Sequence, residues 1–210
     1  RGIETVTYML NGKFEHEDST GSKGNMGPGD IQWMKTGRGI IHSEMPAMSG
    51  GKLLGFQLWI NMPASMKMNK PKYDYIKSNQ KTKFEDQDKK INLIAGKYEN
   101  VEGPIKGHNV EPIYFDIELN ENKKINLIVP ETHNSFVYLL RGDIKIGSRE
   151  QKKINDSTLV LLEKGSNLEI LANKKSKFLF IAGKPIGEPI ARGGPFVMNT
   201  KAEILQAIQD

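Results

Sequence analysis

Two side chains with metal-binding chemistry stand close together in the segment His42-Ser43-Glu44, which continues a short strand predicted at residues 39–42. In a β-strand, residues i and i+2 point to the same face, so His42 and Glu44 would project together. An imidazole and a carboxylate on one side can bind iron, manganese, nickel or zinc. The pair therefore indicates a metal site. A His-x-Glu pair is also common on exposed surfaces, and two ligands do not complete a site.

The other three histidines supply no clear second half for such a site. His16 lies in a polar segment rich in carboxylates, which would raise its affinity for protons and is ordinary for a surface residue. His108 lies in a predicted loop. His133 precedes a predicted strand in the second half of the chain and could take a ligand position there, but nothing nearby completes a set. We interpret all three as structural or solvated residues.

Glu4 and the two tryptophans are further candidates near this site. Glu4 lies on the first predicted strand, where burial of its carboxylate would be costly unless it is paired or binds a metal. Arg38 could pair with it. Trp33 and Trp59 could line a pocket, although the hydrophobic core is the more common place for such residues.

Short strands must position these residues. Strands are predicted at residues 4–10, 13–18, 31–34, 39–42 and 54–60, and in a second series at 91–95, 113–119, 124–129, 135–140, 144–146, 158–162, 168–171 and 178–182. Asn11-Gly12 predicts a hairpin between the first two strands. Many short strands at this spacing are typical of an all-β sandwich or barrel. Thr200 and Glu203 form a capping-box pattern that predicts a short C-terminal helix.

The strands fall into two series, which predicts two domains. Residues 67–92 are polar and charged, so we interpret them as a linker. We assign residues 1–78 to the first domain, and residues 79–210, with the terminal helix, to the second. Residues 8–14 and 138–144 each combine an apolar strand, a glycine turn and a second strand, which favours a duplicated β-barrel unit.

The composition excludes several classes of protein. The chain has no cysteine, which excludes disulfide-stabilised domains and thiolate metal clusters and leaves histidine and carboxylate as metal ligands. No apolar run approaches the ~20 residues of a membrane-spanning helix. The net charge is +5, but the basic residues are scattered rather than gathered into a nucleic-acid-binding patch. We therefore expect no direct contact with membranes or nucleic acid.

Several ordered segments resemble the pirin family. They are residues 1–8 (RGIETVTY), 27–34 (GPGDIQWM), 37–46 (GRGIIHSEMP), 57–61 (QLWIN) and 194–200 (GPFVMNT). The resemblance runs from residue 1 to residue 210 and is strongest in the first 75 residues and at the C-terminal motif. It implies a bicupin: two cupin β-barrel domains, with one metal site in the N-terminal barrel.

Pirins hold a non-haem iron through three histidines and one glutamate. Two histidines come from a His-Pro-His-Arg-Gly segment, and the third comes with the glutamate from a His-x-Glu segment. The resemblance therefore implies that His42 and Glu44 are metal ligands. Arg1-Gly2 matches the end of the first segment, so we expect two ligand histidines just upstream of Arg1. Glu4 holds the ligand position of a generic cupin, but the pirin pattern places it beside the site.

The resemblance implies two functions between which the residues do not decide. Some pirins have quercetin 2,3-dioxygenase activity, in which a flavonol would bind iron through its 3-hydroxyl, Glu44 would accept that proton as the catalytic base, and dioxygen would add to the ring. Eukaryotic members act as nuclear cofactors of transcription factors, so a metal-binding partner protein without turnover is the alternative. A scaffold with a vestigial site is a third interpretation. We expect a monomer located in the cytoplasm, the nucleus or both.

Overall fold

The chain divides into two compact units in the computed structural model, which describes residues 1–147 and 151–210. The first unit comprises residues 1–80 together with residues 186–210, and the second comprises residues 81–185. The sequence analysis divided the chain after residue 78 and assigned the C-terminal segment to the second domain. That segment instead packs with the first unit.

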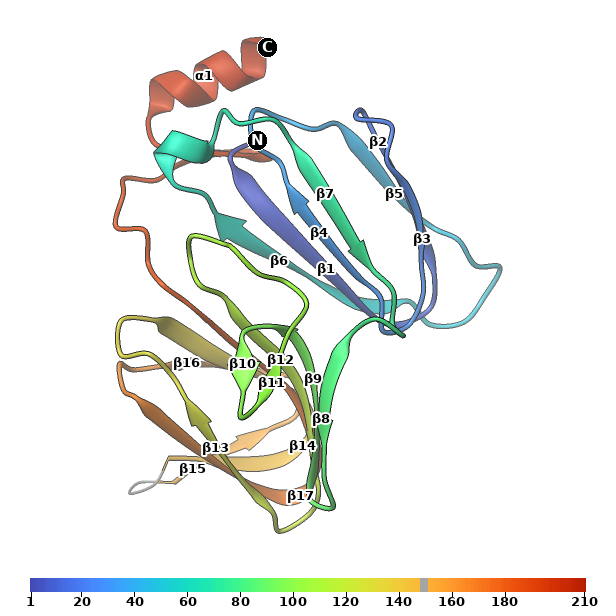
Figure 1. The fold of residues 1–210 in the computed structure, drawn as a ribbon, viewed down its shortest axis with the longest axis vertical. Coiled ribbons are helices and arrows are strands. Elements are labelled where there is room, and N and C mark those ends of the chain that lie inside the picture. Colours follow the sequence, from blue (N-terminus) through green and yellow to red (C-terminus); the bar gives the residue numbers. More distant parts are fainter. Residues whose placement is uncertain (148–150) are drawn as a thin grey trace. The chain divides into compact units, whose positions relative to one another are not determined.

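Two antiparallel sheets and a C-terminal segment form the first unit (Figure 1). The four-stranded sheet has the order β6 (Leu54–Asn61), β1 (Ile3–Asn11), β4 (Ile31–Lys35) and β7 (Lys72–Ile76). The three-stranded sheet has the order β3 (Lys23–Met26), β2 (Phe14–Asp18) and β5 (His42–Pro46). The remaining elements are the 3-10 helix η1 (Ala64–Met66), the strand pair β18 (Ala191–Gly193) and β19 (Phe196–Met198), and helix α1 (Lys201–Gln209).

The predicted hairpin at Asn11-Gly12 is wrong, because β1 and β2 do not pair with each other. Strand β1 pairs with β4 and β6, and β2 pairs with β3 and β5. Both edges of each strand are therefore occupied. Gly12 has φ +82°, which glycine adopts without strain, and the turn carries the chain from one sheet to the other.

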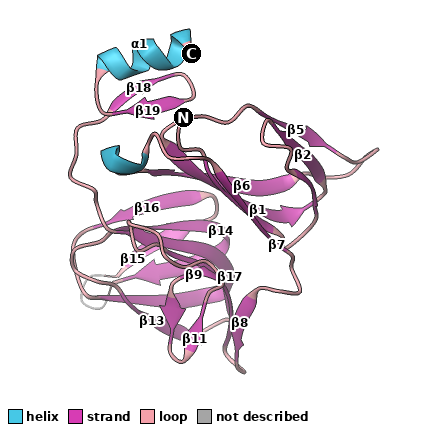
Figure 2. Cartoon of the chain, turned by 45° about the horizontal axis from the view of Figure 1, so that its top comes forward, coloured by secondary structure: helices cyan, strands magenta, loops and turns pink. Residues whose placement is uncertain are grey.

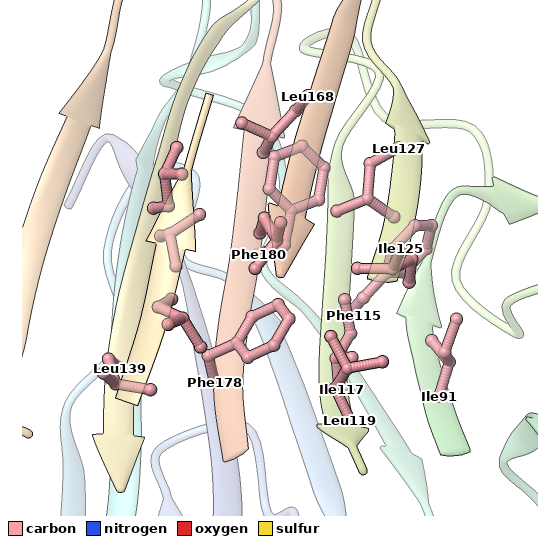
Figure 3. Close-up of a cluster of buried hydrophobic side chains, with 14 of the residues drawn as sticks. Ile91, Phe115, Ile117, Leu119, Ile125, Leu127, Leu139, Leu168, Phe178 and Phe180 are labelled. Atoms are coloured by element: carbon pink, nitrogen blue, oxygen red, sulfur yellow. The ribbon is translucent and has the colours of Figure 1, made fainter. Parts of the chain in front are cut away.

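The second unit is built on one eight-stranded antiparallel sheet. Its strands are β8 (Thr82–Glu85), β9 (Lys89–Ala95), β12 (Ile113–Leu119), β13 (Lys124–Ile128), β14 (Asn134–Ile146), β15 (Lys152–Asn155), β16 (Thr158–Leu162) and β17 (Asn167–Gly183), and a separate pair joins β10 (Lys97–Tyr98) to β11 (Val101–Glu102). Alternating apolar residues from these strands form a common core, and Figure 3 shows Phe115, Phe178 and Phe180 within it. Burial of each such side chain stabilises the fold by about 1.5–3 kcal/mol.

Two pairs of predicted strands are continuous in the structure. Residues 135–140 and 144–146 belong to β14, and residues 168–171 and 178–182 belong to β17. Gly142 has φ +110° and lies among the register shifts where β14 bends, so this glycine marks an irregularity within a strand rather than a turn. The predicted linker at residues 67–92 also contains β7, β8 and the start of β9.

The predicted capping box and C-terminal helix are confirmed. The Thr200 side chain accepts a hydrogen bond from the Glu203 backbone N–H, and the Glu203 carboxylate accepts one from the Thr200 backbone N–H. Helix α1 buries Ile204 and Ala207 and lies beside β18 and β19 (Figure 2). Within residues 1–147 and 151–210, no helix has the length and apolar character needed to cross a membrane. The described chain is otherwise mainly strand, as the all-β prediction requires.

Candidate metal centre

Strands β2 and β5 bring two histidines and one glutamate together in the first unit. Antiparallel pairing sets His16 opposite Glu44 and Asp18 opposite His42. Ligand atoms of His16, His42 and Glu44 all lie within 4.8 Å of one another. The Nδ1 atoms of His16 and His42 are each 3.9 Å from Glu44 Oε1, which accords with the prediction that His42 and Glu44 project together.

His16 was interpreted above as a structural or solvated residue, and the structure shows that it is buried. Only 1% of the residue is exposed, its Nε2 lies 3.1 Å from Asp18 Oδ2, and its ring stacks on Tyr73. Burial alone would lower the pKa of His16, but the carboxylates of Glu44 and Asp18 outweigh this effect and raise it. The alternation of Phe14 and His16 on one face of β2 is the sequence signal that could have indicated burial.

Two glutamine amides hold the Glu44 carboxylate, one on each oxygen. Gln32 Nε2 donates to Oε1 at 3.0 Å, and Gln57 Nε2 donates to Oε2 at 3.0 Å. The indole of Trp59 can only donate, and it donates to Gln57 Oε1 at 3.0 Å, which directs the Gln57 amide nitrogen toward Glu44. Tyr73 Oη donates to Gln32 Oε1 at 3.2 Å and has the same effect on that amide.

These contacts favour an ionised Glu44. Burial alone would raise the pKa of Glu44, but His16, His42 and Gln32 outweigh burial and hold it below its usual value. An ionised carboxylate only accepts hydrogen bonds, which matches the two amide donors that face it. Glu44 is therefore prepared to act as a ligand or as a proton acceptor.

The other predicted site residues lie on two opposite faces of the four-stranded sheet. Thr7 pairs with both Gln32 and Gln57, so these residues share the face that meets Glu44, and Trp59 lies on that face two residues beyond Gln57. The same register places Glu4 and Trp33 on the opposite face.

Glu4 is held by neighbours on that opposite face. Trp33 Nε1 donates to Glu4 Oε2 at 2.6 Å, and Lys35 Nζ lies 3.9 Å from Glu4 Oε1. Glu4 and Trp33 are both buried, and these contacts help to compensate the Glu4 carboxylate.

The remaining histidines lie outside this cluster. His133 is buried in the second unit with its Nε2 3.0 Å from the Glu111 carbonyl, and His108 is also buried there. Residues 1–147 and 151–210 contain one group of three or more histidine and acidic side chains within reach of a common ion, namely His16, His42 and Glu44.

The chemistry and spacing of these donors suit a transition-metal ion. Imidazole and carboxylate are the donor types of iron, nickel and zinc sites in proteins. Bonds of about 2.1 Å place the ligand atoms of one ion roughly 3–4 Å apart, and the 3.9 Å separation between His42 Nδ1 and Glu44 Oε1 falls within that range. The residues present therefore fit a metal ion.

Comparisons with known proteins agree with this architecture. The pirin family profile matches residues 1–60, and the pirin C-terminal cupin domain profile matches residues 114–210. A pirin-like protein of Caulobacter vibrioides is 38% identical over 212 residues, covering 100% of this chain and 76% of the relative. Pirin-1 of Arabidopsis thaliana is 38% identical over 214 residues, covering 100% and 74%.

A solved structure gives the same result for the fold. The quercetin 2,3-dioxygenase from Acinetobacter baumannii superposes with a TM-score of 0.92 at 34% sequence identity, covering 100% of this chain and 74% of that chain. The predicted architecture of two cupin barrels with a short C-terminal helix is thus confirmed. On the strength of these matches along its whole length, the chain belongs to the pirin family of the cupin superfamily.

Proposed function

We propose that this protein is an iron-dependent dioxygenase that opens a flavonol such as quercetin, with His42 and Glu44 as metal ligands. The observation that carries the proposal is the convergence of His42 and Glu44 beside the buried His16. The similarity to a quercetin 2,3-dioxygenase supports the substrate class. The ligand set of the pirin pattern contains two further histidines.

Glu44 would also be the proton acceptor of the reaction. Bound iron would supply Lewis acidity toward the flavonol 3-hydroxyl and the electron-transfer chemistry that dioxygen requires. The low pKa of Glu44 keeps it ionised at neutral pH, but it also makes Glu44 a weak base. Proton transfer to a Glu44 oxygen therefore depends on a substrate hydroxyl that has itself become acidic.

Gln32 and Gln57 would set the direction of that transfer. Each amide occupies one lone-pair direction of the carboxylate, so the proton must arrive along a direction that they leave open. Trp59 lies next to Gln57 and is 42% exposed, with the Arg192 guanidinium 5.4 Å from its ring centre. Its indole would contact an aromatic ring of the substrate.

Oxygen consumption tests this proposal. Full-length, iron-loaded protein should consume dioxygen and remove the flavonol absorption band of quercetin under air. His42→Ala should lose both activities, whereas His133→Ala, which removes a buried histidine of the second unit, should keep them. Iron-loaded wild-type protein that leaves quercetin and dioxygen unchanged would exclude the enzymatic proposal.

A metal-binding nuclear cofactor of a transcription factor is the second candidate. Ile41 and Met45, which flank the candidate ligands, are 82% and 61% exposed, and a protein partner would cover such apolar side chains. This function requires a purified transcription factor to bind the iron-loaded wild type in one iron oxidation state and not to bind His42→Ala.

Elemental analysis addresses the vestigial-scaffold interpretation, because stoichiometric iron in full-length protein would exclude it.

A further inference from the structure

We propose that His16 and Asp18 form a positioning pair that fixes the Glu44 carboxylate for metal binding. The inference rests on the metal site proposed above and gives a role to two residues with buried side chains outside the pirin ligand pattern. The side chains of His16 and Asp18 are both 0% exposed. Neither residue is assigned as a ligand here; each acts through Glu44.

Asp18 is a rigid anchor for the histidine. Its Oδ1 accepts hydrogen bonds from the Thr20 N–H at 2.8 Å, the Thr20 hydroxyl at 2.6 Å and the Ser22 N–H at 3.2 Å. Its Oδ2 is left for His16 Nε2, 3.1 Å away. A carboxylate held by three donors on one oxygen has little freedom to rotate, so the His16 ring is held with it.

The held ring presents its other nitrogen to Glu44. The Tyr73 ring stacks on His16 with centroids 5.0 Å apart and an angle of 21° between the planes. Strand pairing sets His16 directly opposite Glu44, and His16 Nδ1 faces Glu44 Oε1. Gln32 Nε2 lies 3.4 Å from His16 Nδ1 and 3.0 Å from Glu44 Oε1, so one amide touches both side chains.

The contacts form a continuous chain from the β2–β3 turn to the candidate ligand. Asp18 holds His16, the Gln32 amide contacts both His16 Nδ1 and Glu44 Oε1, and Gln57 holds Glu44 Oε2. His16 Nδ1 itself lies 3.9 Å from Glu44 Oε1, the range of an ion pair. Groups that orient a metal ligand without touching the ion commonly change metal affinity 10- to 100-fold when they are removed. The alternative is that the pair only stabilises the β2–β3 turn, in which case its loss would lower stability and leave metal affinity unchanged.

The test measures metal affinity and stability in full-length protein. Fe2+ is titrated anaerobically, and Co2+ is titrated with its visible absorption bands recorded. His16→Gln and Asp18→Asn should each weaken binding about 10- to 100-fold. His133→Gln, which changes a buried histidine of the second unit, should bind as the wild type does. Circular dichroism shows whether each variant folds. Asp18→Asn changes the side-chain volume little, so the metal titration can be made with this variant if His16→Gln does not fold.

A double-mutant cycle identifies the route of the effect. If His16 acts through Glu44, His16→Gln should cause no further loss of affinity in a Glu44→Gln background. An equal loss in both backgrounds, with altered Co2+ bands, would make His16 a direct ligand and overturn the inference. Unchanged affinity in both single variants would overturn it too. Wild-type protein that binds neither ion would instead refute the metal site itself.

Discussion

Lys67 joins three distant parts of the first unit through one buried ammonium group. Its Nζ donates to the Gly2 carbonyl at 2.8 Å, the Asn61 side-chain carbonyl at 2.6 Å and the Val197 carbonyl at 2.7 Å. Only 1% of the residue is exposed. We predict that Lys67→Met, which keeps an unbranched apolar stem but removes every donor, destabilises this unit.

The size of the effect follows from the acceptors that lose their donor. Each buried acceptor left without a partner costs about 1–3 kcal/mol. Removing the ammonium also removes its own desolvation cost, which offsets part of that sum. We therefore expect the free energy of unfolding to fall by about 3 kcal/mol, equivalent to a lowering of the melting temperature by roughly 10 °C.

Tryptophan fluorescence can follow this unit selectively, because both tryptophans of the chain, Trp33 and Trp59, lie in it. Urea titrations of wild type and Lys67→Met give the difference in free energy. Lys72→Met is the matched control: its lysine is exposed and paired with Asp74, and such surface pairs contribute about 0–1 kcal/mol. A loss below about 1 kcal/mol for Lys67→Met, equal to that of the control, would refute the reasoning.

The pH dependence provides a second measurement on the same variant. Burial lowers the pKa of Lys67, so the folded chain holds this proton less tightly than the unfolded chain, whose lysine titrates near 10.5. The contribution of Lys67 to stability must then rise with pH between the folded pKa and 10.5. Below that window both states are protonated and the contribution is constant. Lys67→Met should lack the rise, and an equal rise in the two proteins would contradict this prediction.

The remaining predictions concern a ligand, a helix cap and a strand bend. His42→Ala should abolish iron retention, measured by elemental analysis, while the unfolding free energy changes by less than about 1 kcal/mol because the side chain is partly exposed. Thr200→Ala should lower the free energy of unfolding by about 1 kcal/mol, measured by thermal melting, since it removes the acceptor for the Glu203 N–H. Gly142→Ala should lower the free energy of unfolding, measured by urea titration, by more than about 2 kcal/mol. The reason is that φ is +110° at this position and a Cβ would lie 2.2 Å from Ser176 Oγ.

Local sequence patterns predicted the elements better than their partners. The range 113–119 predicted for β12 and the range 158–162 predicted for β16 agree with the structure, because alternation depends on each segment alone. The hairpin at Asn11-Gly12 failed because the turn signal does not say whether the next strand returns to the same sheet. Pairing of β1 with β4 and β6 depends on residues far along the chain.

In the candidate site, too, local sequence predicts some features, whereas others depend on residues from distant strands. The face shared by His42 and Glu44 follows from the two-residue period of a strand, and the sequence alone predicts it. The burial of His16 does not follow from its acidic neighbours, because it depends on the Asp18 anchor and on Tyr73, which comes from the other sheet. The predicted role of Trp59 at the site remains open to test, whereas Glu4 and Trp33 lie on the opposite sheet face.

The return of residues 186–210 to the first unit has a consequence for synthesis of the chain. Domains usually fold in order from the N-terminus while the ribosome adds about 5–20 residues per second. Here Val197, which accepts a bond from Lys67, is translated only after the whole of the second unit. The second unit is continuous in sequence and can finish folding first. The first unit, which carries the candidate metal centre, cannot complete its fold until residues 186–210 have been synthesised. Translation that stops near residue 185 would therefore leave the first unit incomplete.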